Sequence, residues 1–116
     1  LVTCVPMHKD TLRKRGYNQA ELLAKECARI LGIEYADLLA KTKKNKTQHS
    51  IKAAERAKNV IGVYSPIDKN LIKGKRILII DDIITTGSTL GECARILNKC
   101  KCGEICCCTL CTSLLI

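Results

Sequence analysis

The stretch that decides the fold is Ile77-Leu78-Ile79-Ile80-Asp81-Asp82-Ile83-Ile84-Thr85-Thr86-Gly87-Ser88-Thr89. Its first four residues form an unbroken apolar run, which is typical of a central parallel strand that is covered on both faces. Two adjacent carboxylates follow, then a hydroxyl-rich loop with one glycine, and then an amphipathic helix. Because ligands of open α/β sheets bind at the carboxyl ends of strands, this order predicts a binding site at residues 81–89.

The loop after this strand has the composition of a phosphate site. A helix N-terminus offers unpaired N–H groups and a partial positive charge, and Gly87 lets the backbone approach a ligand closely. Four other loop residues add hydroxyl donors: Thr85, Thr86, Ser88 and Thr89. The carboxylates suit a vicinal diol or a hydrated Mg²⁺ instead. A diol beside a phosphate describes a ribose 5-phosphate, whereas an ordinary acidic turn with an N-cap explains only one Asp and one Thr.

The rest of the chain alternates strands with helices. Asn18 and Glu21 resemble a capping box, apolar residues follow at helical spacing, and Gly32 closes that helix. Its expected buried face is Ala20, Leu23, Cys27, Ile30 and Leu31. A second amphipathic helix is expected around residues 90–97. Further strands are expected at residues 1–5, 34–40, 60–64 and 105–110, and loops at 7–17 and 41–59. This alternation predicts an α/β fold with a largely parallel central sheet flanked by helices.

Length and composition bound the class of protein. A chain of 116 residues with 47% hydrophobic and 27% charged residues is expected to form one soluble domain, spanning residues 1–116. No apolar run approaches the roughly 20 residues of a membrane span, and no signal peptide opens the chain. Because the first residue is Leu1 rather than Met, we expect a fragment or a processed product.

The net charge of +9 is concentrated in two segments. Residues 9–15 hold four basic residues against one acidic residue, and residues 41–58 hold seven against one. Clustered charge focuses a field, so a polyanionic partner is expected, either a polyphosphate or a nucleic acid. Three tyrosines and no Phe or Trp make a poor stacking platform for single-stranded nucleic acid, which favours the polyphosphate.

Nine cysteines are many for this length, and six of them lie between residues 100 and 111. Three are adjacent within an apolar run that is typical of a buried strand, so we interpret them as free thiols that act as small hydrophobes in a reducing cytoplasm. The alternative is a metal site formed by Cys100, Cys102 and Cys106, although a second paired cysteine knuckle is missing.

The stretch at residues 77–89 resembles, at every position, the motif with which type I phosphoribosyltransferases bind 5-phosphoribosyl 1-pyrophosphate (PRPP). The resemblance implies a type I phosphoribosyltransferase-like fold, PRPP and a nitrogen-containing small molecule as substrates, and Mg²⁺ as the cofactor. Asp81 and Asp82 would bind the ribose hydroxyls and lie near the Mg²⁺. The 5-phosphate would be bound by Thr85, Thr86, Gly87, Ser88 and Thr89.

Further blocks resemble the ComF family, which is linked to bacterial competence for DNA uptake. These blocks are Val5-Pro6-Met7-His8, Arg15-Gly16-Tyr17-Asn18-Gln19-Ala20-Glu21-Leu22-Leu23-Ala24, Thr47-Gln48, and Arg56 followed by Asn59-Val60. The cysteine zinc ribbon and the further segment that usually open ComF proteins do not occur here. Lys101-Cys102 replaces the glycine-alanine that usually follows the last helix. Because the N-terminal part of ComF proteins would normally help to cover the acceptor site, the resemblance does not imply which acceptor is used.

The resemblance also assigns the two basic segments. The loop after the first strand would receive the pyrophosphate, with Arg13 and Arg15 as contacts. A catalytic loop would add Lys43 and Lys44. Arginine is common at these positions in the family, and because lysine replaces it here, bidentate contacts to phosphate are less expected. Asp81, Asp82 and Arg56 would be the catalytic residues. Two alternatives stay open: a non-enzymatic, PRPP-responsive accessory protein in DNA uptake, and a plain nucleic-acid-binding module.

Overall fold

The computed structural model describes residues 1–43 and 61–113. Within them lie a three-stranded sheet of order β1-β4-β5 and a two-stranded sheet formed by β2 and β3. The elements in chain order are β1 (Val2–Cys4), α1 (Lys9–Arg15), α2 (Gln19–Leu31), β2 (Leu39–Lys41), β3 (Tyr64–Pro66), α4 (Lys69–Ile72), β4 (Arg76–Ile84), α5 (Ser88–Lys99) and β5 (Glu104–Thr112). No helix in these two ranges is long and apolar enough to cross a membrane.

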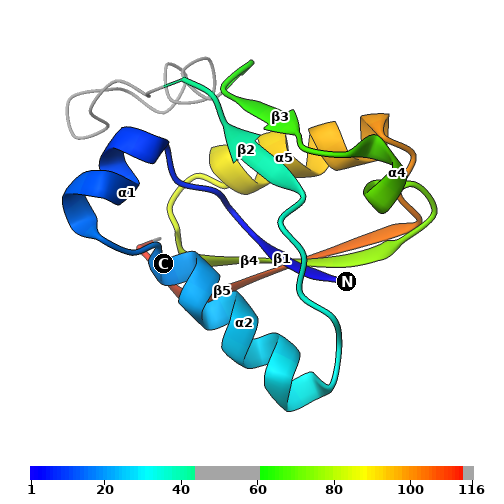
Figure 1. Ribbon diagram of the computed structural model, residues 1–116, viewed down its shortest axis with the longest axis horizontal. Coiled ribbons are helices and arrows are strands. Elements are labelled where there is room, and N and C mark those ends of the chain that lie inside the picture. Colours follow the sequence, from blue (N-terminus) through cyan, green and yellow to red (C-terminus); the bar gives the residue numbers. More distant parts are fainter. Residues whose placement is uncertain (44–60, 114–116) are drawn as a thin grey trace.

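The elements form layers around the parallel sheet (Figure 1). Helix α2 covers one face of β1 and β4, while α5 and the β2–β3 pair lie on the other face. The side chains of β4 alternate accordingly: Ile77 and Ile79 pack with α5, and Leu78 and Ile80 pack with α2. This arrangement confirms the expected α/β fold with a parallel sheet between helices, because both faces of β4 need apolar cover.

Helix α2 confirms the predicted boundaries. The Asn18 side chain accepts a hydrogen bond from the backbone N–H of Ala20, and Gly32 ends the helix in the left-handed conformation. The predicted buried face is partly wrong, however. The fully buried residues are Ala20, Ala24 and Ala28, whereas Ile30 is 68% exposed. The stripe of small side chains lets the helix lie close to the sheet, which the larger residues on its flank would not allow.

Three elements differ from the predicted ones. Residues 9–15, predicted as a loop, form helix α1, which starts at a His8 cap, ends at Gly16 and buries none of its own residues. The expected strands at 34–40 and 60–64 lie at the later residues Leu39–Lys41 and Tyr64–Pro66 and pair antiparallel to each other. The physical reason is that α1 and these short strands carry little periodic apolar pattern, so caps and tertiary pairing decide them.

Strand β5 occurs where it was predicted, but it is not buried. Cys106, Cys107 and Cys108 are exposed on β5, which is the edge strand of the described sheet. The alternative metal site is not formed either. Within residues 1–43 and 61–113 no group of three His, Cys, Asp or Glu side chains is placed to hold a metal ion.

Candidate functional site

The two carboxylates lie on β4, beyond the end of its pairing with β1. Strand β1 pairs with β4 only as far as Ile80, whereas Asp81 still pairs with Thr109 of β5. One side of the acidic pair is therefore open. The Asp81 carboxylate accepts a hydrogen bond from the Asp82 N–H at 2.9 Å, and the Asp82 carboxylate accepts one from the Ile83 N–H at 2.9 Å. These bonds fix both side chains while leaving oxygens for a ligand.

The environment of Asp81 disfavours its ionised form. Burial, helped by the neighbouring Asp82, raises the pKa of the Asp81 carboxyl from 3.8 to about 7, against a smaller opposing effect from the Lys41 ammonium. A partly buried acid with a raised pKa at the end of a central strand is typical of a ligand site. An incoming hydrogen-bond donor or cation would offset the free-energy cost of ionising the buried carboxyl.

The raised pKa predicts how stability depends on pH. The native state binds a proton at Asp81 more tightly than the unfolded chain, so this group stabilises the fold at low pH. That stabilisation is lost as the pH rises from 3.8 towards about 7. We expect the ligand-free Asp81→Asn variant to exceed the wild type in unfolding free energy by about 1–2 kcal/mol at pH 8 and by much less at pH 4. Urea unfolding at both pH values measures this difference, and an equal difference at both would contradict it.

The loop from Thr85 to Ser88 is shaped by a glycine and two hydroxyls. Gly87 has a φ of 82°, in the left-handed region, and precedes α5 without a side-chain cap. The Thr86 hydroxyl accepts a hydrogen bond from the Ser88 N–H at 3.3 Å and lies 2.8 Å from the Ser88 hydroxyl. The end of β4, the loop and the first turn of α5 together line a small hollow of about 20 Å³: Asp81, Ile83, Ile84, Thr85, Thr86, Gly87, Ser88, Thr89 and Leu90.

The block at residues 15–19 sets the other wall of the site. Gly16 ends α1 with a φ of 90°, which turns the chain towards α2. Asn18 is buried and joins the end of β1 to the start of α2. Its side-chain amide donates to the Val5 carbonyl at 3.2 Å, and its side-chain oxygen accepts from the Ala20 N–H at 3.1 Å. The block most specific to the ComF resemblance thus holds the end of β1 against the start of α2.

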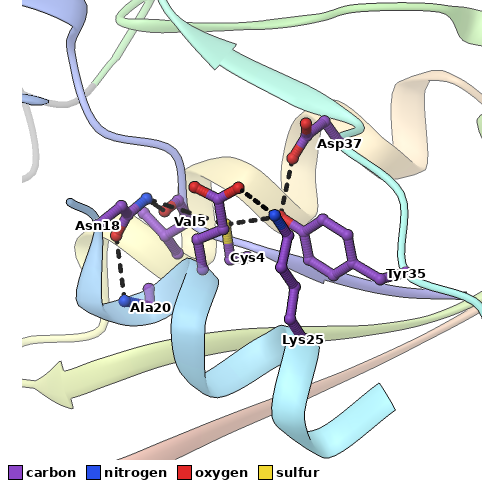
Figure 2. A network of polar contacts seen from close by, with 8 residues as sticks. Cys4, Val5, Asn18, Ala20, Lys25, Tyr35 and Asp37 are labelled. Carbon is purple, nitrogen blue, oxygen red and sulfur yellow. Dashed lines mark hydrogen bonds and ion pairs between the residues drawn. The ribbon is translucent and has the colours of Figure 1, made fainter. Parts of the chain in front are cut away.

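A polar network behind this wall joins three segments (Figure 2). The Tyr35 hydroxyl donates to Asp37 at 2.8 Å and lies 3.3 Å from the Cys4 sulfur. The Lys25 ammonium pairs with Glu21 at 2.9 Å and lies over the Tyr35 ring. Burial raises the pKa of the Cys4 thiol to about 11, so Cys4 stays protonated and serves as a packing group.

A cavity of about 220 Å³ brings several predicted residues together. Asp81, Asp82 and Thr89 line it from β4 and α5, and Arg15 lines it from the end of α1. A larger cavity of about 630 Å³ adjoins it and shares lining residues with it: Pro6, Met7, His8, Asn18 and Lys41.

Two other predicted contacts, Arg13 and Lys43, do not line this cavity. Both residues are exposed. Lys44 and Arg56 lie outside the described residues. Of the four pyrophosphate contacts predicted from the sequence, the described part of the chain therefore places only Arg15 beside the acidic pair.

Lys41 and Tyr64 are cavity residues that the sequence analysis missed. They are register partners in the β2–β3 pair, and the Lys41 ammonium lies 5.8 Å from the centre of the Tyr64 ring. Lys41 shares a face of β2 with the buried Leu39, so strand alternation turns it inward. Burial lowers the pKa of Lys41, and the nearby Asp81 opposes that shift. The basic run at residues 41–46 indicated that a lysine could reach the site. Only the pairing of β2 with β3 shows that this lysine is Lys41.

Comparison with known proteins gives the family. A family model described as phosphoribosyl transferase domain matches residues 18–114. The chain is 36% identical to Competence protein F of Haemophilus influenzae over 103 residues, which are 87% of this chain and 45% of that protein. It is 29% identical to DNA utilization protein YhgH of Escherichia coli K12 over 99 residues, which are 84% of this chain and 43% of that protein.

A third relative is Competence protein ComFC of Streptococcus pneumoniae, 33% identical over 95 residues, or 82% of this chain and 40% of that protein. The chain therefore spans less than half the length of these curated relatives. Their names confirm the ComF resemblance that the motif blocks at residues 5–24 predicted.

Solved structures agree on the fold. The allosteric regulatory enzyme of purine biosynthesis superposes with a TM-score of 0.62 at 23% identity, over 94% of this chain and 21% of that one. Glutamine PRPP amidotransferase from B. subtilis gives a TM-score of 0.62 at 22% identity, over 94% of this chain and 22% of that one. These likenesses bear on the fold alone. From the family model, the relatives and the fold together, the chain belongs to the phosphoribosyl transferase domain family and is related to the competence proteins of the ComF type.

Proposed function

We propose that this chain binds PRPP at the carboxyl end of β4 and transfers its phosphoribosyl group to a nitrogen nucleophile, with release of pyrophosphate. The observation that carries the proposal is the shared cavity, in which the Asp81 and Asp82 carboxylates lie with basic side chains from two other elements, Arg15 and Lys41. Carboxylates suit the ribose diol, and cations suit the pyrophosphate. The loop at residues 85–89 and the first turn of α5 would hold the 5-phosphate.

In this reaction the nitrogen lone pair bonds to the anomeric carbon while the bond from that carbon to the pyrophosphate oxygen breaks. The electron pair leaves with the pyrophosphate, and the nitrogen loses its proton to solvent. Asp81 and Asp82 would orient the sugar, and Arg15 and Lys41 would stabilise the negative charge that develops on the leaving group. No protein nucleophile is required, and Arg56 remains a proposed catalytic residue from the sequence alone.

The residues present fit Mg²⁺ as the cofactor. Mg²⁺ prefers oxygen ligands, keeps several waters and usually takes one or two carboxylates together with substrate phosphates. The open side of the Asp81–Asp82 pair offers such carboxylates next to the proposed pyrophosphate position. When bound, the ion would supply charge neutralisation on the pyrophosphate.

Calorimetric titration of PRPP with Mg²⁺ into the folded chain tests the proposal. We expect saturable binding, with ribose 5-phosphate and pyrophosphate each competing more weakly, since each occupies only part of the site. The absence of saturable binding to the folded chain would overturn the proposed function. Pyrophosphate release in the presence of a panel of nucleobases and amines then tests turnover and identifies the acceptor.

A second candidate is a PRPP-responsive accessory protein in DNA utilisation. The names of the relatives favour it, since they refer to competence and DNA utilization, as do the two basic segments counted in the sequence. This candidate keeps PRPP binding but lacks turnover. Saturable PRPP binding without pyrophosphate release under every acceptor tested would support it over the enzyme.

The position of Lys41 leads to a prediction about pyrophosphate affinity. We expect Lys41→Met to weaken pyrophosphate binding about tenfold or more, because a charge-assisted hydrogen bond at a half-buried site is lost. Lys43→Met is the matched control: it removes the same charge from an exposed residue nearby and is expected to change the affinity less than about twofold. Calorimetry with Mg²⁺-pyrophosphate measures both, and a larger effect at Lys43 would contradict the assignment of Lys41.

A further inference from the structure

Strand β5 pairs with β4 along one edge, and no described strand pairs with its other edge. The Leu78 N–H donates to the Leu1 carbonyl, and the Ile80 carbonyl accepts from the Val5 N–H, so the even-numbered backbone groups of β4 between Arg76 and Ile80 point towards β1. Its odd-numbered groups, such as those of Ile79, therefore point towards β5. In a parallel pair, each such residue bonds to the two neighbours of its register partner.

This rule fixes which β5 groups are open. Ile77 and Ile79 are in register with Ile105 and Cys107. Their backbone bonds therefore go to neighbours of these residues, including Cys106, which leaves the N–H and C=O of Ile105 and Cys107 pointing outward. In the described part of the chain no strand lies on that outer side of β5.

The regular part of this edge, from Ile105 to Thr109, lacks the features that usually protect edge strands. Natural edges carry lysines, prolines or an inward-pointing charge, or are very short. Strand β5 is nine residues long, and from Ile105 to Thr112 it contains no charged residue, proline or glycine. None of its residues is buried, and Leu110 is 74% exposed. The apolar sequence is typical of a covered strand, whereas no strand among residues 1–43 and 61–113 covers its outer edge.

We propose that β5 pairs antiparallel with β5 of a second copy of this chain. The pairing would join the two sheets into one sheet of order β1-β4-β5-β5-β4-β1. Such a contact is isologous, because the same strand serves both copies around a two-fold axis and no other element is needed. The ladder of β5 with β4 skips the pair Asp82 and Leu110, so its regular part is centred near Cys107. Cys107 then faces its own copy, and Ile105 faces Thr109.

Charge favours a second copy at this edge. The chain carries a net charge of +9, which opposes self-association at most surfaces, but β5 contributes only Glu104, which pairs with Arg76 of the same chain at 2.8 Å. In the antiparallel arrangement Glu104 lies opposite Leu110 of the other copy, far from the second Glu104. No like charges face each other across the proposed ladder, so the ladder itself adds no charge repulsion.

Sedimentation equilibrium and amide hydrogen exchange of the 116-residue chain under reducing conditions test this proposal. We expect a dimer that dissociates on dilution. The Ile105 and Cys107 amides should exchange about tenfold or more slowly in the dimer than in the dilute monomer. The Cys106 amide, bonded to β4, should be protected in both and serves as the internal control. A chain that is monomeric at every concentration, or a dimer with fast Ile105 and Cys107 exchange, would overturn the proposal.

A proline variant tests the same edge by mutation. Cys107→Pro removes only an outward N–H, which an edge strand tolerates, and should abolish the dimer. The matched variant Cys107→Ala keeps the N–H and should remain dimeric. Circular dichroism shows whether both variants are folded. If the proline variant is unfolded, the amide exchange pattern of the wild type decides whether β5 forms the dimer contact. A dimer that survives Cys107→Pro would overturn the proposal, as would a monomer with protected Ile105 and Cys107 amides.

Discussion

The Asp81→Asn/Asp82→Asn double variant is expected to bind PRPP and Mg²⁺ at least about 100-fold more weakly than the wild type. Each carboxylate would accept charge-assisted hydrogen bonds from the ribose hydroxyls, and an amide both weakens these bonds and presents N–H donors. Calorimetric titration measures the loss. Because burial raises the pKa of Asp81 to about 7, the same change relieves a cost in the ligand-free fold, so lost binding should coincide with undiminished stability at pH 8.

The matched control is Glu26→Gln/Glu104→Gln. It changes the net charge by the same amount, but both glutamates are surface residues in exposed ion pairs. We expect this control to retain the wild-type PRPP affinity within about threefold. Equal losses in the two double variants would point to a general effect of charge. Retained affinity in the aspartate variant would show that the carboxylates do not bind the ribose. For a plain nucleic-acid-binding module, by contrast, Asp82→Asn should slightly strengthen DNA binding, with a steep salt dependence and no response to PRPP.

The Ala24→Leu substitution is expected to lower the free energy of unfolding by about 1–3 kcal/mol, although it adds apolar surface. Ala24 is fully buried in the middle of the small-residue stripe of α2, together with Ala20 and Ala28. A leucine there forces α2 away from β1 and β4, and the polar network between α2, Cys4 and Tyr35 moves with it. Urea unfolding monitored by circular dichroism measures the change.

Ile30→Ala is the matched control for this prediction. The spacing of apolar residues placed Ile30 on the buried face, but the side chain is 68% exposed. We therefore expect its truncation to change the unfolding free energy by less than about 0.5 kcal/mol. If Ile30→Ala costs more than Ala24→Leu, then the large apolar residues of α2 are covered in solution and the close packing of the alanine stripe is not limiting.

Some residues of the candidate site could be predicted from the sequence, and others could not. Asp81, Asp82 and Gly87 could be identified because strand, turn and helix follow each other directly, so their geometry is set by neighbours in the chain. Of the basic side chains that face them, the family resemblance predicted Arg15 and missed Lys41. Arg15 reaches the cavity because α1 ends at Gly16. Lys41 reaches it because β2 pairs with β3 and turns alternate residues inward.

The chain order alone determined the parallel α/β arrangement, the capped helix from Gln19 to Leu31 and the acidic strand end, because each depends on contacts between near neighbours or on a strong apolar run. The tertiary structure decided which face of α2 is buried, that residues 9–15 form a helix, and that the cysteine-rich β5 lies at the edge of the described sheet. The physical reason is that burial depends on what lies opposite a segment. The alanine stripe of α2 is buried because it packs against β1 and β4. An apolar strand, in the same way, is buried only where another element covers it.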